Sequence, residues 1–573
     1  VKKLDEMGLL VKVEDYENNV GFSERGDVPI EPRLSDQWFL KYPRVEEAKR
    51  AVESGKIKFW PQRWEKTYLH WLDNIRDWCI SRQIWWGHRI PVWYKKGVEK
   101  IDLSNPEHVH VSVKGPSDPE NWVQDGDSLD TWASSWLWPF ATMGWPDPEA
   151  MKKSGLSSFY PTSDLVTGPD IIFFWVARMI MAGLEFMDGD EDARIPFKNV
   201  YFTGIIRDMQ GRKMSKSLGN SPDPLEIIAK YGADGLRFGV MSCAPQGQDI
   251  LFSEERVELG RNFCNKLWNA CRFRQMSGPA ADNSSLEKTV SRIDFSKLDA
   301  DDRAVLSSLA ETSKLVAGDY ETYQFNSITQ RLYAFFWTDF CDWYLEVSKS
   351  RLADESARET VLAVQDLCLR GTLLLLHPFM PFITEELWHS MGFGSPESFI
   401  QNENPDVAGA LAAAGISPDA EALAQSRALR DFATKARALK AQYRLANRRD
   451  SKFYFTSDDA NAEIIAQNAE KLRRLAGAES IERRAEVSDC PAAIAELGTI
   501  YLDLSDSIDA DAEKARLGKE KQKLEGLIAS TSARLGNESF VSKAPAKVIE
   551  GAKRQLEEYK AKLAEIEKLM ANL

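Results

Sequence analysis

Three segments of this 573-residue chain decide its fold class: SDLVT at 163–167, DIIFFWVARMIMAGLEF at 170–186 and KNVYFTGII at 198–206. The first and last are short runs bounded by turn residues, which indicates strands. The middle segment is long enough for a helix. A strand, a helix and a second strand in succession predict a parallel α/β sheet, and in such sheets ligands bind outside the carboxyl ends of the strands.

The loop after the second predicted strand is GRKMSKSLGN, residues 211–220. It places three cationic side chains between two glycines, so one interpretation is a solvated basic turn. The other is that Lys213 and Lys216 close over a triphosphate and stabilise the charge that develops as pyrophosphate leaves. Met214 would anchor the loop on apolar surface, and Ser215 offers a hydroxyl donor. The position at a strand's carboxyl end favours the phosphate site.

The composition is that of a large multidomain protein. The chain has 43% hydrophobic and 28% charged residues. At 573 residues it is too long for a single hydrophobic core and is expected to divide into roughly three to five domains. Its net charge of −14 excludes a protein that coats nucleic acid indiscriminately, because phosphate binding needs positive surface. No apolar run is long enough to predict a membrane span. The seven cysteines show no pairing pattern and the first residues no signal-peptide layout, which together predict reduced thiols and a cytoplasmic protein.

Other segments predict further domains. Tryptophans that recur every seven residues predict one apolar helix face: Trp64, Trp71, Trp78 and Trp85. Residues 95–120 are polar and predict an inserted loop or small hairpin. The run 254–395 is amphipathic almost throughout and predicts a helical bundle. The alanine-rich run 406–420 predicts a linker, and residues 421–505 alternate helix and strand as in a small α/β module.

The end of the chain has the clearest periodicity. Apolar positions there alternate steps of three and four: Ile549, Ala552, Leu556, Tyr559, Leu563, Ile566, Met570 and Leu573. A similar series precedes the break GNESFVSKAPA: Leu517, Leu524, Ile528, Thr531 and Leu535. Two such helices around a turn predict an antiparallel coiled-coil hairpin. Residues 511–573 carry 13 Lys and Arg against 10 Asp and Glu, so this arm is positive on a negative chain.

A second basic region, KARALKAQYRLANRR at 435–449, has two interpretations. A helix would place four cations along one face: Arg437, Lys440, Arg444 and Arg448. This face is either solvated or binds the phosphates of an RNA.

The KMSKS stretch at 213–217 resembles the second signature of the class I aminoacyl-tRNA synthetases. Seven further stretches resemble the valine-specific branch of that family, in the family's order: WCISRQIWWGHRIPVWY (78–94), LDTWASSWLWPF (129–140), TGPDIIFFWVARM (167–179), YGADGLRF (231–238), NFCNKLWNACRF (262–273), FFWTDFCDWYLE (335–346) and LHPFMPFITEELW (376–388). The resemblance runs from the first residues to the last. LDTWASS, DIIFFW and the terminal arm favour the valine branch over an isoleucyl or leucyl relative, which stays an alternative.

This resemblance implies a valine–tRNA ligase that uses ATP with Mg²⁺ as a substrate. Residues expected to contact ATP are Lys213, Ser215, Lys216, Gly168 and Asp170, with the two lysines catalytic and Lys216 contributing most. Residues expected to wall the valine pocket are Trp132, Ile171 and Trp175. The RNA partner would be tRNA(Val), contacted through Arg437, Lys440, Arg444 and Arg448 and by the arm, and the protein is expected to be a monomer.

Departures from the family pattern qualify this interpretation. The family's first signature, the His-Ile-Gly-His stretch on the other side of ATP, has no match, so we expect a fragment that cannot activate valine alone. Residues 95–123 contain no cysteine where many relatives carry a zinc cluster, so no metal is predicted. The alternative is a truncated, non-catalytic tRNA-binding protein.

The predicted fold class is multidomain: an α/β Rossmann-like catalytic half, an all-α anticodon-binding bundle, a small α/β module and an antiparallel coiled coil. The expected boundaries are 1–40 for the tail of an editing domain, 41–200 for the second catalytic half with its insert at 95–120, 201–260 for the KMSKS loop and stem-contact region, 261–405 for the helical anticodon-binding domain, 406–508 for the linker and module, and 509–573 for the tRNA-binding arm.

Overall fold

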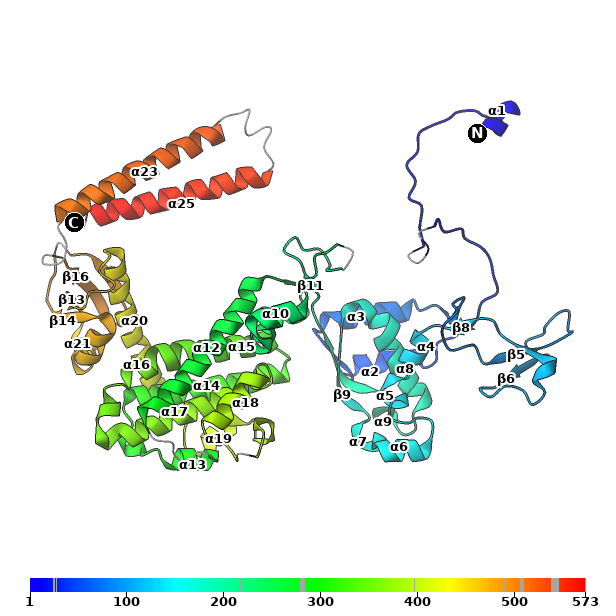
Figure 1. The fold of residues 1–573 in the computed structure, drawn as a ribbon, viewed down its shortest axis with the longest axis horizontal. Helices are drawn as coiled ribbons and strands as arrows, with labels where there is room; N and C mark the ends of the chain where they lie inside the picture. The colour runs from blue at the N-terminus through cyan, green and yellow to red at the C-terminus, as the bar shows by residue number, and fades with distance from the viewer. Residues whose placement is uncertain are drawn as a thin grey trace. The chain divides into compact units, whose positions relative to one another are not determined.

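The computed structural model describes residues 1–573 except 24, 25, 27, 216–217, 279–283, 396, 489, 505–509, 537–545 and 572–573. The chain forms two compact units, Val1–Thr203 and Gly204–Leu573. Figure 1 colours them from blue at the N-terminus to red at the C-terminus. The first unit is built on a parallel sheet and the second on a large helical core.

The first unit contains the predicted parallel sheet. Its strands are β2 (Lys58–Trp60), β9 (Thr162–Thr167) and β10 (Phe197–Phe202), in the order β2-β10-β9. Val200 at the centre of β10 lies opposite Phe59 on one side and Leu165 on the other. The two strands predicted from the sequence are therefore neighbours, and the prediction of a parallel α/β sheet is confirmed.

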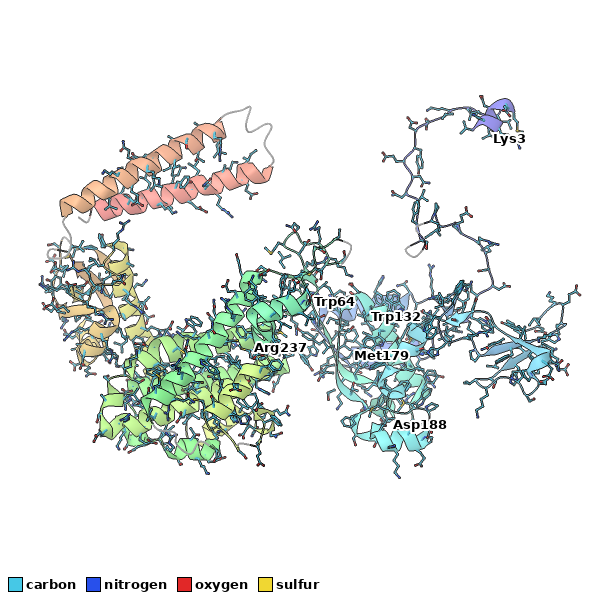
Figure 2. The ribbon with its side chains drawn as sticks, viewed as in Figure 1. Lys3, Trp64, Trp132, Met179, Asp188 and Arg237 are labelled. Carbon is cyan, nitrogen blue, oxygen red and sulfur yellow. The ribbon has the colours of Figure 1, made fainter. Side chains whose placement is uncertain are left out.

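The predicted helix between these strands is present, but it starts irregularly. A 3₁₀ turn (Pro169–Ile171) and five residues of π-helix (Ile172–Val176) precede the α-helix α8 (Ala177–Phe186). All of α8 from Ala177 to Leu184 is buried, and Arg178 is the charged side chain within this otherwise apolar stretch. Helix α2 (Val45–Glu53) packs against it. Figure 2 shows Met179 of α8 among the packed side chains.

The second predicted strand is shorter than expected. It ends at Phe202 rather than Ile206, and Ile206–Arg207 forms β11, which pairs with β12 (Ile250–Leu251) of the second unit. β10 ends where its partner β9 ends, with Phe202 opposite Thr167, and two residues later the chain passes close to Gln248, because a Cβ at Gly204 would lie 1.7 Å from the carbonyl oxygen of Gln248. Only a glycine lets the two backbones approach this closely.

The prediction of one helix face for the four tryptophans is wrong beyond Trp71. Helix α3 (Arg63–Asp73) holds Trp64 and Trp71, but Trp78 begins β3 (Trp78–Cys79), which pairs with β1 (Phe39–Leu40), and the side chain of Trp85 is fully exposed. Trp71 and Trp78 still meet around the ring of Tyr42, with centroids 6.0 and 5.9 Å away. The tryptophans gather through tertiary contact, which sequence spacing does not reveal.

Smaller elements complete the first unit. The predicted insertion is an antiparallel sheet in the order β6-β5-β7: β5 (Val92–Lys95), β6 (Val109–Val111) and β7 (Trp122–Gln124). β4 (Ser81–Arg82) pairs with β8 (Ser128–Leu129). The short helices are α1 (Lys2–Glu6), α4 (Trp132–Ser135), α5 (Trp138–Ala141), α6 (Pro148–Ser154), α7 (Leu156–Phe159) and α9 (Glu191–Arg194).

The second unit is mainly helical, as predicted. Its helices up to residue 390 are α10 (Pro224–Tyr231), α11 (Ala233–Met241), α12 (Glu254–Ser277), α13 (Leu286–Ser291), α14 (Ala300–Glu321), α15 (Phe325–Ala334), the π-helix Phe335–Tyr344, α16 (Leu345–Val347), α17 (Glu355–Leu376) and α18 (Pro381–Ser390). α17 is the central helix, because every residue from Thr360 to Leu373 is buried. Asp366 of this helix accepts hydrogen bonds through Oδ2 from the guanidinium groups of Arg274, at 2.7 Å, and Arg292, at 2.8 Å. Paired charges can be buried at this depth.

The run predicted to be a linker belongs to the core instead. It contains α19 (Val407–Ala413), which packs on α14 with Val407 and Leu411 buried. After α20 (Ala420–Gln442) comes a four-stranded sheet in the order β14-β13-β16-β15, with α21 (Asp459–Gln467) and α22 (Ala469–Ala476). The strands are β13 (Ser451–Thr456), β14 (Ala478–Arg483), β15 (Ala492–Ala495) and β16 (Gly498–Asp503).

The chain's last described elements are two long helices, α23 (Ala510–Gly536) and α25 (Ala546–Ala571). They pack on each other through Leu517, Leu524 and Ile566, and Figure 1 shows them side by side. Lys521 and Glu567 form an ion pair across them at 2.8 Å. The predicted pair of helices is thus present, while Leu573 of the predicted periodicity lies outside the described residues. Within the described ranges, no helix is both long and apolar enough to cross a membrane.

Candidate functional site

Two of the predicted pocket residues lie together in the first unit. Trp132 begins α4, and its ring stacks on Phe174 with centroids 5.8 Å apart. Trp175 donates its indole N–H to the carbonyl oxygen of Ser135, at the other end of α4, at 2.9 Å. Both indoles are half-buried, so they form a partly open apolar wall.

The residues predicted to approach a nucleotide follow directly from the sheet. Gly168 comes after Thr167, the last residue of β9, and Asp170 and Ile171 lie in the next 3₁₀ turn. The N–H of Thr203, just past β10, donates to the carbonyl of Thr167 at 2.9 Å, which holds the two strand ends together. Asp170 is exposed and Ile171 half-buried. These three residues therefore follow the carboxyl end of β9, and their part in ligand binding stays a prediction.

A buried aspartate that the sequence analysis did not single out organises this wall. Asp130 is 6% exposed, and its Oδ2 accepts the indole N–H of Trp78 at 2.9 Å and Nη2 of Arg82 at 2.8 Å. Its Oδ1 accepts the backbone N–H of Trp132 at 3.2 Å. The carboxylate therefore fixes the start of the helix that carries Trp132.

Arg178 completes this cluster from α8. Its guanidinium lies 3.6 Å from the ring centroid of Trp78, and its Nη1 is 3.9 Å from Oδ2 of Asp130. Its Nε donates to the hydroxyl of Tyr42 at 2.9 Å. The pKa of Tyr42 is raised, chiefly by burial, so this phenol stays neutral. A signal was present in the sequence, since a charge within the apolar run 170–186 needs a buried partner.

Residues 211–220, which we call the lysine loop, belong to the second unit. Two side chains close this loop at its base. Oδ1 of Asp208 accepts the backbone N–H of Arg212 at 2.8 Å, and its Oδ2 accepts Nε of Arg212 at 2.7 Å. Asn220 donates to Oδ2 of Asp208 at 2.9 Å and accepts the N–H of Ser215 at 2.9 Å. We call this Asp208 and Asn220 pair the loop clamp.

The loop clamp also fixes the main chain of Lys213. The Asn220 amide donates to the carbonyl of Lys213 at 3.3 Å, and Lys213 bridges Arg207 in a short antiparallel contact. The hydrogen bond from Asn220, with those from Arg212, lowers the pKa of Asp208 to about 2. The side chain of Lys213 is exposed, whereas its main chain is held by these contacts. Lys216 lies outside the described residues, and its role stays a prediction.

The structure corrects the predicted RNA-binding face at Lys440. This side chain is 1% exposed, and its ammonium donates to the carbonyl oxygens of Arg448, Ala476 (3.2 Å) and Gly477 (2.6 Å). It thereby satisfies carbonyls at the end of α22 and cannot reach a phosphate. Burial lowers its pKa.

The rest of that face is discontinuous. α20 ends at Gln442, and Arg444 has a left-handed backbone with φ of 60°, so it does not continue the helix. Arg448 pairs with Asp450 at 2.6 Å. Arg437 remains an exposed cation on α20.

Side chains that could ligate a metal are scattered. Among the residues that the structure describes, no three His, Cys, Asp or Glu side chains gather closely enough to hold a metal ion. The expectation that the chain carries no zinc stays a prediction.

Three family models match successive parts of the chain. They are "tRNA synthetases class I (I, L, M and V)" at residues 9–253, "Anticodon-binding domain of tRNA ligase" at 302–455 and "Valyl tRNA synthetase tRNA binding arm" at 509–573. The chain therefore belongs to the class I aminoacyl-tRNA synthetases, and to their valine–tRNA ligase family.

Relatives that match over the whole chain support this assignment. The valine–tRNA ligase of Chlorobaculum tepidum is 42% identical over 590 aligned residues, and that of Bacillus subtilis is 41% identical over 585. The valine–tRNA ligase of Thermotoga maritima is 41% identical over 581. Each alignment covers all of this chain and 63% of the relative, so the chain spans less than two thirds of their length.

Proposed function

We propose that this chain works in a valine–tRNA ligase, which activates valine with ATP and transfers it to tRNA(Val). The observation that carries the proposal is the 42% identity to a valine–tRNA ligase along the entire chain, from the sheet to the last helix. In the first step a valine carboxylate oxygen attacks the α-phosphorus of ATP, and the bond from that phosphorus to the pyrophosphate oxygen breaks. In the second step a ribose hydroxyl at the tRNA terminus attacks the carbonyl carbon of the adenylate, and AMP leaves.

The candidate site residues fit these steps by their chemistry. Lys213 and Lys216 supply ammonium groups for the charge that develops on pyrophosphate, and Ser215 adds a hydroxyl donor. Gly168 lets a nucleoside approach the strand end, and Asp170 is suited to accept a ribose hydroxyl. Mg²⁺ would accompany the ATP phosphates.

The valine pocket would be formed by the apolar wall. Trp132 and Trp175 present indole faces, and Ile171 a branched aliphatic chain. Such side chains exclude water and larger amino acids by size. Because Asp130 fixes the start of α4, this wall keeps a constant shape.

We assign tRNA binding to the second unit. The helical region around α14 and α17 would meet the anticodon end, and α23 with α25 would act as an antiparallel coiled-coil arm on another part of the tRNA. Arg437 and Arg444 offer exposed cations for phosphates, whereas Lys440 serves the fold. We further propose a cytoplasmic monomer with the domain boundaries predicted from the sequence, except that residues 406–420 belong to the helical core and are not a linker.

Specific tRNA binding tests the proposal on this chain. Its affinity for tRNA(Val) is compared with that for the same tRNA carrying a changed anticodon, by filter binding at moderate salt. We expect tRNA(Val) to bind at least about tenfold more tightly, because a specific site adds base contacts to the phosphate contacts that both share. Equal affinities would contradict it.

Activity separates the ligase from a non-catalytic tRNA-binding protein. Valine-dependent pyrophosphate exchange is measured on the whole gene product and on this chain. We expect exchange from the whole product. Lys213→Ala in the whole product should lower the rate of this exchange at least about 100-fold. A whole product that binds tRNA(Val) without exchange would favour the binding protein.

Two arginine variants locate the tRNA surface. Arg437→Ala is expected to weaken tRNA binding about fivefold and to lower the salt slope by about one, as for one lost phosphate contact. Arg50→Ala, an exposed arginine on α2 of the first unit, is the matched control and should change neither.

A further inference from the structure

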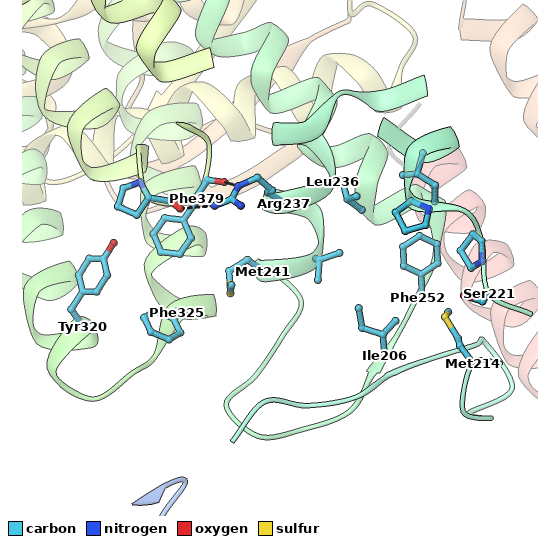
Figure 3. A pocket seen from close by; sticks show the side chains of 15 residues that line it. Ile206, Met214, Ser221, Leu236, Arg237, Met241, Phe252, Tyr320, Phe325 and Phe379 are labelled. Atoms are coloured by element: carbon cyan, nitrogen blue, oxygen red, sulfur yellow. Dashed lines mark hydrogen bonds between the residues drawn. The ribbon is translucent and has the colours of Figure 1, made fainter. Parts of the chain in front are cut away.

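An apolar cavity lies beneath the lysine loop in the second unit. It measures about 640 Å³, within the range of small-molecule sites. Six of its lining side chains carry the argument: Met214, Leu236, Arg237, Tyr320, Phe325 and Phe379. Figure 3 shows Met214 and Tyr320 at opposite ends of the lining.

One end of the cavity is aromatic. The ring of Tyr320 meets Phe325 edge-on at 6.2 Å between centroids and Phe379 in a tilted contact at 6.3 Å. Burial raises the pKa of Tyr320 to about 12, so its phenol carries no charge at neutral pH. Aromatic rings in this arrangement present faces and edges to a flat ligand.

The cavity does not suit a phosphate. Arg237 is the charged side chain among the described lining residues, and its guanidinium donates to the carbonyl oxygens of Phe379 at 3.0 Å and Pro378 at 2.9 Å. Its donors are directed to the main chain, as Figure 3 shows. An anion entering the cavity would lose its hydration without gaining a free cation, which is costly. The cavity is therefore chemically distinct from the exposed ammonium side of the loop.

We propose that this cavity is a binding site for a neutral, planar, apolar small molecule, and that its occupancy stabilises the lysine loop through Met214. Met214 belongs to the loop but lines the cavity, between Lys213 and Ser215, whose main-chain groups the loop clamp holds. A flexible thioether adapts its shape to a ligand. A ligand that contacts Met214 only in this loop position must shift the loop toward it. The inference goes beyond the ligase proposal and does not depend on it, because ligand binding is measured directly.

Binding is tested with 2-acetylnaphthalene, a neutral planar probe, titrated by saturation-transfer NMR. The unmodified chain should bind it with a dissociation constant of about 1 mM or tighter, as expected for a fragment of this size in an apolar pocket. Leu236→Trp, which fills the cavity, should weaken binding at least about tenfold. The matched control is Leu315→Trp, at a 42% exposed position on α14 outside the lining, and it should bind like the unmodified chain.

Circular dichroism and thermal melting establish that both tryptophan variants are folded. If the unmodified chain does not bind the probe, or if Leu236→Trp binds it as well as Leu315→Trp does, the cavity site is refuted.

Limited trypsin digestion tests the coupling to the loop. The probe should slow cleavage after Arg212 and Lys213 about threefold or more in the unmodified chain, since the occupied cavity favours the clamped loop. Met214→Ser should still bind the probe but lose the protection. Equal protection in Met214→Ser, or none in the unmodified chain, would overturn the coupling.

Discussion

Asp130 and Asp208 each gather several donors, but they do so in different surroundings. Asp130 lies under aromatic rings and joins residues far apart in the sequence, since its Oδ2 accepts from both Trp78 and Arg82 and lies 3.9 Å from Arg178. Asp208 accepts from donors within twelve residues, at Gln210, Arg212 and Asn220.

This difference separates a fixed wall from a loop that can open. Releasing Asp130 would leave Arg178 buried with its charge unpaired, so the wall of Trp132 and Trp175 opens only if the surrounding core does. Releasing Asp208, which is 8% exposed, frees only hydrogen bonds within one short stretch of the second unit. Local bonds of this kind break in small openings that leave the global fold intact.

The largest expected effect comes from Asp130→Ala. It should lower the unfolding free energy of the first unit by about 3–5 kcal/mol, because one partner of a buried charge pair is removed. The measurement is urea unfolding followed by tryptophan fluorescence. The control is Asp73→Ala, which breaks the exposed ion pair with Lys49 and should cost less than about 1 kcal/mol. Similar losses in both variants would show that the Asp130 network is no more rigid than a surface pair.

An intermediate effect is expected for the loop clamp. Asp208→Ala should speed hydrogen exchange at the Arg212 and Ser215 amides about tenfold, since their acceptors are the clamp itself. Mass spectrometry with fragmentation reads these amides. The melting temperature should change by no more than about 2 °C, in contrast to Asp130→Ala.

A second variant tests whether the two clamp residues act together. Asn220→Ala should also speed exchange at Ser215, and the double variant should exceed the larger single effect only slightly. Fully additive effects would mean that Asp208 and Asn220 hold the loop independently.

The smallest effect is a pH dependence of the same amides. The pKa of Asp208 is about 2 in the folded loop and about 3.9 when unfolded, so its stabilisation is complete above about pH 4. It should fall away as the pH drops through about 2. Exchange at Ser215, corrected for the intrinsic rate, should therefore rise at the acidic end, and Asp208→Asn should abolish this rise. A rise that persists in Asp208→Asn would assign the titration to another group.

The sequence was most informative where structure is local. The parallel strands and the buried helix between them follow from segment length, turn residues and apolar character, and the structure confirms them. The same reasoning extended the second strand to Ile206, whereas β10 ends at Phe202, because the partner strand that it pairs with ends at Thr167. The same reasoning failed for Trp78. Trp71 and Trp78 are seven residues apart, as on one helix face, but they lie in different elements and meet around the ring of Tyr42.

For the candidate site, the sequence predicted the types of residue present but not the hydrogen-bond partners of each side chain. Gly168, Asp170 and Ile171 directly follow β9 in the chain, so chain order in a parallel sheet accounts for their place at the strand end. The burial of Lys440 depends on carbonyls at the end of α22, 36 and 37 residues later, so a helical count alone placed it on the surface. Asp130 was overlooked because its donors come from separate strands and helices.

The contact at Gly204 also has a consequence for sequence variation. A Cβ at this position would lie 1.7 Å from the Gln248 carbonyl oxygen, and no rotamer of any other residue relieves the overlap, because the clash is with backbone. In a saturation library at this position, selected for folded protein, glycine alone should survive. Gly211 has nothing within 4 Å of where its Cβ would lie, so there only its left-handed backbone, with φ of 79°, limits the choice, and asparagine should be recovered beside glycine. The residues accepted at these two glycines would thus be limited by different causes, lack of space for a side chain at Gly204 and a left-handed backbone at Gly211.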